Sequence, residues 1–483
     1  MKKYLFAMLI LTLLLTGCAS KTAAVETPET GAPAAETASP AAGAFTVNGE
    51  AAAKDGVATI TAPGTYVVSG TLADGQLVIA ADKDDEIFIT LDGADITNKS
   101  GAAIYASHGL VTLTLAPGTQ NTLTDGGADF AYADADKEEP NAALFSKDNL
   151  TITGTGALTV NAGFLNGVGS KDDLTIDGGS ITVTAAQDGL HAGDNLTVSG
   201  GALTVSAGDD GIHADTELTV SGGEIQVLAS YEGLEAANVN ISGGDISVVS
   251  SDDGINAAGG SDGETTGGGF GRDAFAVGDY SINVSGGSIT VQAGGDGLDS
   301  NGTINISGGY IVSLINSRAN GALDANGAVT VTGGTVIYGG TEMEAHPGAD
   351  STQSYAYTDV GISADTPVIL KKDGKTLIEF TPFLDCRYLA FSSPEIVSGE
   401  SYEIYSGETL LATVTAGVGG GGGFGFGGGQ RPGGDFGGFA DGELPSGEFG
   451  ERPPGGGRGR PNGGLGAPPP DGTAATPPPI PEA

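Results

Sequence analysis

Two neighbouring stretches of the chain decide the fold. Leu196–Ala214 reads LTVSGGALTVSAGDDGIHA, and Leu218–Ala236 reads LTVSGGEIQVLASYEGLEA. Apolar and polar residues alternate within each stretch, which is the two-residue period of a β-strand and not the 3.6-residue period of a helix. Both stretches carry a Gly-Gly pair at the same place, and these pairs begin at Gly200 and Gly222, 22 residues apart.

The Gly-Gly pair recurs along the middle of the chain. Pairs begin at Gly178, Gly200, Gly222, Gly243, Gly286, Gly308 and Gly333. The usual step is close to 22 residues, and the one step of 43 residues (243 to 286) holds one unit and an insertion of comparable size. Three short strands in about 22 residues, with a glycine corner that permits positive φ, suit one coil of a parallel β-helix. A sandwich needs longer antiparallel strands, and a propeller blade needs about 40–50 residues. The repeat therefore predicts an all-β fold, a parallel β-helix with about 22 residues per coil.

The two ends of the chain differ from the repeat in composition. Residues 1–17 combine Lys2 and Lys3 with a short apolar run, which is typical of a secretory signal peptide. The run ends in Leu15-Thr16-Gly17-Cys18, which resembles the lipobox of bacterial lipoproteins. That resemblance implies lipidation of Cys18 and a protein anchored at the bacterial cell membrane and exposed outside the cell.

Composition also divides the rest of the chain. An Ala/Thr/Pro/Glu-rich segment indicates a disordered linker, and a Gly/Pro-rich segment indicates a disordered tail. The predicted organisation is a signal peptide over 1–17, a linker over 18–44, the β-helix over 45–350, a C-terminal β segment or cap over 351–416, and a tail over 417–483.

The charge of the chain limits its partners. It has 60 Asp and Glu residues against 19 Lys and Arg, a formal net charge of −41. Nucleic-acid binding depends on Lys and Arg that displace counterions from phosphates, so this class of partner is excluded. Cations, or polymers bridged through cations, are the expected partners, and we expect a monomer.

Two polar columns follow from the repeat. Nine residues after the second glycine of successive pairs stand Asp188, Asp210, Glu232, Asp253 and Asp296. Three residues later stand His191, His213, Glu235, Asn256 and Asp299. Equivalent positions of a β-helix stack about 4.8 Å apart, where two carboxylates repel by about 1 kcal/mol even in water.

A cation between the carboxylates would relieve this repulsion. An oxygen-only donor set suits Ca²⁺. The expected calcium ligands are Asp188, Asp209, Asp210, Glu232, Asp252, Asp253, Asp296, Asp299 and Asp324. The alternative is that Asp-Gly simply forms turns, although this leaves the second column unexplained. At His191 and His213 a softer metal, a turn cap or a ligand contact are the open alternatives.

Specific motifs point to a family. The repeated DGxHA and DGxDS units, ANGALD (Ala319–Asp324), TQNTLTD (Thr119–Asp125) and NAALFSKD (Asn141–Asp148) resemble a bacterial family of carbohydrate-binding domain proteins. The resemblance covers roughly residues 45–410. It implies a secreted, right-handed parallel β-helix that binds Ca²⁺ and is associated with cellulose and acidic, pectin-like polysaccharides. Glu232 and Glu235 depart from the usual Asp-type pair, which puts a metal at that coil in doubt.

The expected function is calcium-dependent, non-catalytic binding of a polysaccharide at the cell surface. Candidate ligand contacts are His191, His213, Asn256, Tyr231, Phe270, Tyr280 and Tyr310, several of them near the Gly-rich insertion at 257–279. One alternative is a polysaccharide lyase acting on polyuronates, with Arg318 as the candidate base. Another is a structural surface spacer or adhesin.

Overall fold

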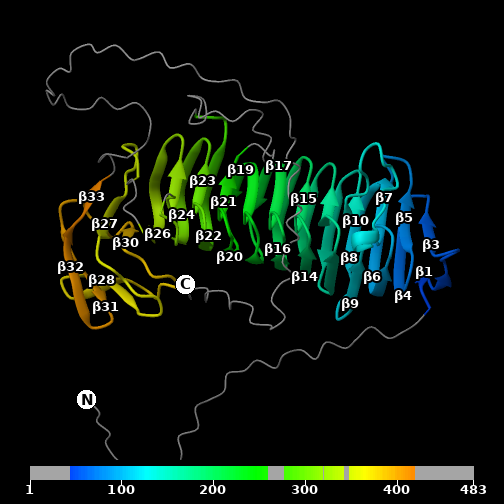
Figure 1. Ribbon diagram of the computed structural model, residues 1–483, viewed down its shortest axis with the longest axis horizontal. Helices are drawn as coiled ribbons and strands as arrows, with labels where there is room; N and C mark the ends of the chain where they lie inside the picture. The colour runs from blue at the N-terminus through cyan, green and yellow to red at the C-terminus, as the bar shows by residue number, and fades with distance from the viewer. Residues whose placement is uncertain (1–43, 259–276, 319, 342–346, 419–483) are drawn as a thin grey trace, which may run out of the picture. The chain divides into compact units, whose positions relative to one another are not determined.

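The computed structural model describes residues 44–258, 277–318, 320–341 and 347–418 (Figure 1). Cys18 and Phe270 lie outside these ranges, as do the predicted signal peptide and nearly all of the predicted linker and tail. Within the described ranges, no helix combines the length and the apolar character needed to cross a membrane.

A parallel β-helix makes up most of the described chain (Figure 1). Leu174 pairs with Leu196, and Leu196 pairs with Leu218, so one repeat of the sequence is one coil. Val239 pairs with Ile282 across the 43-residue step, which is therefore a single coil carrying an insertion. The predicted all-β fold and its coil length are confirmed.

The strands of the β-helix are, in chain order, β3 (Val57–Ile60), β4 (Gly64–Leu72), β5 (Gln76–Ala80), β6 (Glu86–Thr97), β7 (Ile104–His108), β8 (Leu110–Leu115), β9 (Gln120–Thr124), β10 (Ala142–Ser146), β11 (Leu150–Gly154), β12 (Ala157–Ala162), β13 (Asn166–Ser170), β14 (Leu174–Ala185), β15 (Leu190–Ala192), β16 (Asn195–Ser206), β17 (Ile212–Val220), β18 (Glu224–Ala229), β19 (Leu234–Ile241), β20 (Asp245–Val249), β21 (Ile255–Ala257), β22 (Ser281–Ala293), β23 (Leu298–Ser300), β24 (Thr303–Ile315), β25 (Leu323–Ala325) and β26 (Val329–Gly340). A short 3₁₀ helix, η1 (Gly127–Asp129), follows β9.

Each coil contributes three short strand segments, one to each of three faces of the β-helix, which we number in chain order from the segment that contains Leu174 or Leu196. The Gly-Gly pair turns the chain between the first and the second face of each coil. In the coil that starts at Leu196, the first face and the second face both belong to β16, and Gly201 lies between them at a φ of 85°. The second glycine of every pair has a φ between 79° and 90°. Only glycine adopts this conformation without a clash at Cβ.

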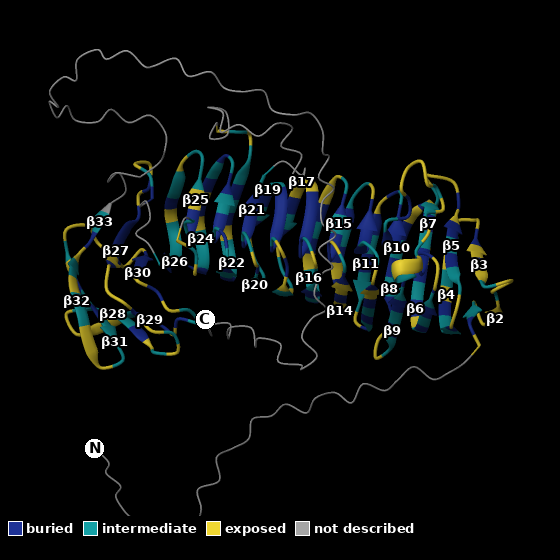
Figure 2. Ribbon diagram, viewed as in Figure 1, coloured by how far each residue is buried: buried dark blue, intermediate teal, exposed yellow. Residues whose placement is uncertain are grey.

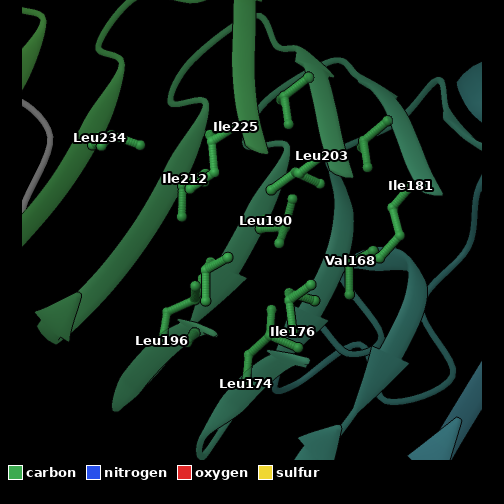
Figure 3. Packing of buried hydrophobic residues seen from close by; sticks show 14 of the residues in the cluster. Val168, Leu174, Ile176, Ile181, Leu190, Leu196, Leu203, Ile212, Ile225 and Leu234 are labelled. Atoms are coloured by element: carbon green, nitrogen blue, oxygen red, sulfur yellow. The ribbon is translucent and has the colours of Figure 1, made fainter. Parts of the chain in front are cut away.

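The interior is a stack of identical apolar positions. Leu190, Ile212 and Leu234 pair in register on the third face, and each has 0% of its surface exposed. Figure 3 shows these side chains pointing into the space that they share with Leu203 and Ile225 of the second face. Figure 2 shows the same pattern along the coils, with buried positions on the strands and most exposed positions at the turns. This burial provides the main stabilisation of each coil.

Antiparallel strands cover both ends of the parallel stack. At the first end, β1 (Thr46–Val47) pairs with β4 and with β2 (Glu50–Ala51). At the other end, β26 pairs with β30 (Tyr388–Ser392), which in turn pairs with β27 (Ser354–Thr358). These pairings cover part of the edges that a solenoid would otherwise expose.

The C-terminal segment also forms a separate four-stranded antiparallel sheet. Its strand order is β29 (Lys375–Phe380), β28 (Val368–Lys372), β31 (Ser401–Ser406) and β32 (Thr409–Thr415). A further two-residue strand, β33 (Gly417–Val418), pairs with β27. Leu370, Tyr402 and Ile404 of this sheet share an apolar cluster with Leu314 of β24 and Ile337 of β26.

Candidate functional site

The third face of the β-helix positions the polar residues. In β15, Leu190 and Ala192 are buried, while His191 between them is half-buried and faces outward. The same middle position in the following third-face strands forms what we call the strand column. Its members, paired coil to coil, are His191, His213, Glu235, Asn256, Asp299 and Asp324.

A second stack lies at the turn before each of these strands. We call it the turn column, and it contains Asp188, Asp210, Glu232, Asp253 and Asp296. The backbone carbonyl of Asp210 accepts a hydrogen bond from Gly189 N at 2.8 Å, and the carbonyl of Glu232 accepts one from Gly211 N at 2.9 Å. Both columns that the sequence predicted are therefore stacked in the structure.

Backbone amides satisfy part of the turn column. Asp188 Oδ1 accepts a hydrogen bond from Asp210 N at 3.3 Å, and Asp253 Oδ1 accepts one from Asp296 N at 2.6 Å. Asp296 Oδ1 accepts a hydrogen bond from Gly321 N. These amide donors offset part of the repulsion between the stacked carboxylates.

Histidine–carboxylate pairs occupy the first coils of the two columns. His191 Nδ1 lies 2.8 Å from Asp188 Oδ2, and His213 Nδ1 lies 2.9 Å from Asp210 Oδ2. His213 Nδ1 is also 2.7 Å from Glu235 Oε2. The Asp188 carboxylate therefore contacts a histidine nitrogen and a backbone amide, and the Asp210 carboxylate contacts a histidine nitrogen.

His213, Asp210 and Glu235 shift one another's pKa. Burial alone would lower the pKa of His213, but its hydrogen bonds to Asp210, Asp215 and Glu235 outweigh burial and raise that pKa. Burial raises the pKa of Asp210 to about 9, against the lowering effect of His213, and Glu235 raises it further. The pKa of Glu235 is lowered, because hydrogen bonds to His213 and Asp210 outweigh its burial. His213, Asp210 and Glu235 therefore form one hydrogen-bonded network in which the protonation of each side chain depends on the other two.

The middle of the columns carries an amide–carboxylate pair. Asn256 Nδ2 donates a hydrogen bond to Glu232 Oε2 at 2.7 Å. Burial raises the pKa of Glu232 to about 8, with a contribution from the nearby Glu235. Glu232 and Glu235 thus face Asn256 and His213, not the carboxylates of the later coils.

The last coils bring oxygen ligands together. One carboxylate oxygen from each of Asp296, Asp299 and Asp324 lies within 4.8 Å of the others, and we call this trio the carboxylate cluster. Burial and the neighbouring carboxylates raise the pKa of Asp296 to about 7 and that of Asp299 to about 8. The same causes, burial first, raise the pKa of Asp253 to about 6.

A glycine leaves room beside this cluster. A Cβ at Gly295 would lie 2.4 Å from the Oδ1 atoms of both Asp252 and Asp253. Asp252 stands at the equivalent position of the preceding coil, because Gly295 N donates a hydrogen bond to Asp252 O at 2.9 Å. The concentration of carboxylate oxygens without nitrogen donors fits a hard cation such as Ca²⁺.

The nine expected calcium ligands thus separate into groups. Asp252, Asp253, Asp296, Asp299 and Asp324 gather around the last coils. Asp188, Asp210 and Glu232 lie beside histidine or amide partners in the earlier coils. Asp209 is half-buried at the adjoining turn, where its carbonyl accepts a hydrogen bond from Tyr231 N at 2.7 Å.

The candidate aromatic contacts have different surroundings. The Tyr231 side chain is 49% exposed, and a hydrogen bond to Asp252 raises its pKa to about 12. Tyr280 and Tyr310 are half-buried and pack against the two apolar clusters, so they contribute to the core. Arg318, the candidate lyase base, is exposed.

An aromatic group that the sequence analysis missed lies on the earlier coils. The rings of Phe130 and Phe164 stack with centroids 4.5 Å apart at 13°, and Tyr132 stands edge-on to both. All three are half-buried, and we call them the aromatic trio. Asp125 holds their two loops together, because its Oδ1 accepts hydrogen bonds from Gly127 N at 2.9 Å and Gly163 N at 2.8 Å.

A hollow of about 390 Å³ adjoins the loop that carries two of these rings. Its lining includes Ala131, which lies between Phe130 and Tyr132, together with polar side chains of Asp55, Asp74, Gln76 and Asn98. The loop that carries Phe130 and Tyr132 therefore borders a polar hollow, which the rings themselves do not line.

Part of the chain is similar to known carbohydrate-binding domain-containing proteins. Residues 54–253 match the family model of carbohydrate-binding domain-containing proteins. A carbohydrate-binding domain-containing protein of Acetivibrio thermocellus is 46% identical over 127 residues, which are 26% of this chain and 44% of that relative. The match thus spans less than half of the relative's length.

A solved structure is also similar. It is described as the polysaccharide lyase-like protein from C. thermocellum, as a gadolinium derivative. The sequences are 30% identical, the match covers 55% of this chain and 90% of that one, and the TM-score is 0.41. Residues 54–253 of the β-helix are therefore similar to carbohydrate-binding domain-containing proteins, in the family match and in the related sequence.

Proposed function

We propose that this protein binds an acidic or cellulosic polysaccharide at the bacterial cell surface, with the help of calcium and without cleaving the polymer. The observation that carries the proposal is the family match over residues 54–253, because it includes the aromatic trio and the polar hollow beside it. The lipobox-like Leu15–Cys18 supports the surface location.

The aromatic trio supplies the kind of surface that sugars contact. The CH face of a pyranose ring packs on an aromatic face, and the polar rim of the sugar needs hydrogen-bonding groups nearby. Phe130, Tyr132 and Phe164 offer the rings, and the neighbouring hollow offers carboxylate and amide groups. We assign the trio as the principal sugar contact, in place of Tyr280 and Tyr310, which pack into the core.

The carboxylate cluster supplies the calcium dependence. Asp296, Asp299 and Asp324 would hold Ca²⁺, with Asp252 and Asp253 adjacent. A bound Ca²⁺ neutralises the cluster and can offer its remaining coordination positions to the carboxylate of a uronate. The open surface at Asp324, which is exposed, gives a polymer access to this end of the β-helix.

Retention on insoluble polymers tests the proposal. The wild-type protein is expected to be retained on cellulose or on Ca²⁺-crosslinked polygalacturonate, and to release no unsaturated uronide into solution. Phe164→Ala should weaken retention about tenfold or more, since one stacking face is lost. Phe88→Ala is the matched control, because Phe88 is 43% exposed on β6, outside the trio.

Two results would contradict this function. If neither polymer retains the wild-type protein, the β-helix serves as a spacer. If uronides accumulate and Arg318→Ala abolishes that release, the protein is a lyase.

A further inference from the structure

The two histidines of the strand column form an arrangement separate from the carboxylate cluster. The rings of His191 and His213 are parallel, with centroids 4.8 Å apart and planes 2° apart. Their Nε2 atoms both face the carboxylate of Asp215, at 4.0 Å for His191 and 3.2 Å for His213. One ligand atom from each of the three residues lies within 4.8 Å of the others.

Carboxylates on the opposite side of the rings orient them. Asp188 Oδ2 lies 2.8 Å from His191 Nδ1, and Asp210 Oδ2 lies 2.9 Å from His213 Nδ1. A metal ion that displaces the proton from Nε2 leaves Nδ1–H donating to the carboxylate and the Nε2 lone pair free to bind the ion. Carboxylate–histidine pairs of this kind orient the histidine ligands of metal ions.

The exposure of the three side chains suits a site that is open on one side. The side chain of His213 is 5% exposed, that of His191 is 25% exposed, and that of Asp215 is 51% exposed. The buried histidine provides a fixed ligand, while rotation of the other two side chains can bring their ligand atoms closer. The exposed side leaves space for water as a fourth ligand.

We propose that His191, His213 and Asp215 bind a transition-metal ion of the Zn²⁺ class. Two imidazole nitrogens and one carboxylate oxygen suit Zn²⁺, Ni²⁺ or Cu²⁺ and do not suit Ca²⁺, which takes oxygen ligands. Asp299 lies three coils beyond His213 in the strand column, about 14 Å away at the spacing of stacked strands. This site is therefore independent of the calcium proposed at the carboxylate cluster.

Calorimetric titration with ZnCl₂ tests the site in the full chain, prepared without a polyhistidine tag and freed of metal. One Zn²⁺ should bind per chain, and excess Ca²⁺ should not displace it. His191→Gln should weaken binding by at least about 100-fold, and Asp188→Asn, which removes the orienting carboxylate, by about 10–100-fold. His108→Gln is the matched control, because His108 is half-exposed on β7 and pairs with Asp148 instead.

Co²⁺ gives a second readout, because a bound ion with two nitrogen ligands has a visible absorption spectrum that depends on its coordination. That spectrum should appear with wild type and with His108→Gln, and should be absent with His191→Gln. Circular dichroism of His191→Gln should match wild type, since His191 faces outward. Equal Zn²⁺ affinity in wild type and His191→Gln, or no Zn²⁺ binding by wild type, would overturn the proposal.

Discussion

The glycine that follows each turn-column residue is required by packing and not by its φ angle. A Cβ at Gly189 would lie 2.2 Å from Val205 Cγ1 and 2.5 Å from Gly211 O. A Cβ at Gly211 would lie 2.6 Å from Gly233 O and 2.8 Å from Val227 Cγ1. The sequence showed Asp-Gly and suggested a turn, but the reason for this glycine is the close approach of the next coil. The repeat period in the sequence does not reveal how closely adjacent coils approach each other.

Gly211→Ala tests this explanation. The added methyl group should destabilise the protein by about 1–3 kcal/mol, because neither a backbone carbonyl nor a buried valine can move away freely. Denaturant unfolding measures the change. Gly361→Ala is the matched control, since nothing lies within 4 Å of a Cβ there. Equal stability of Gly211→Ala and the control would contradict the packing argument.

At the scale of elements, the sequence predicted the positions of residues that recur in each coil and missed the contacts of residues outside the repeat. The spacing of the Gly-Gly pairs was enough to place His191, His213 and Asp299 in one column, because each coil copies the last. It could not predict that Asp215, outside the repeat motif, turns toward both histidines.

The aromatic trio escaped sequence analysis for the same reason. Phe130 and Phe164 are 34 residues apart, which is not a multiple of the coil, and they belong to loops of different length. The one signal in the sequence is Asp125 followed by two glycines, whose amide-binding role appears only when both loops are placed.

The carboxylate cluster predicts how stability depends on pH. The folded state holds protons at Asp299, with a pKa of about 8, more tightly than the unfolded chain, with a pKa near 3.8. Unfolding therefore releases protons between these values, so the free energy of unfolding of the calcium-free protein should fall as pH rises from about 4 to about 8. Each such carboxyl contributes at most about 1.4 kcal/mol per pH unit.

Thermal unfolding in EDTA, followed across this range, measures the effect. Asp299→Asn should make the decline shallower, and Asp84→Asn, at an exposed carboxylate, should leave it unchanged. Saturating Ca²⁺ should remove the decline, because the cation takes the place of the protons. A calcium-free wild type that becomes more stable toward pH 8 would show that the cluster does not hold protons in the folded state.

At the scale of the whole molecule, the acidic composition and the repeat lead to one account. A net charge of −41 predicts that nucleic acid is not a partner, and the coil period was sufficient for the fold. The antiparallel strands that close the two ends were expected only in outline, since pairs such as β26 with β30 join segments without a common period. The chain brings aromatic faces and a carboxylate cluster onto one β-helix, which is the basis of the proposed calcium-dependent binding.

The most direct test of that account compares wild type and Asp299→Asn on covalently crosslinked polygalacturonate, which stays insoluble without calcium, in the presence of Ca²⁺ and of EDTA. The account predicts that wild type is retained with Ca²⁺ and released by EDTA, and that Asp299→Asn is released even with Ca²⁺. Retention of wild type in EDTA, or equal calcium-dependent retention of Asp299→Asn, would contradict it.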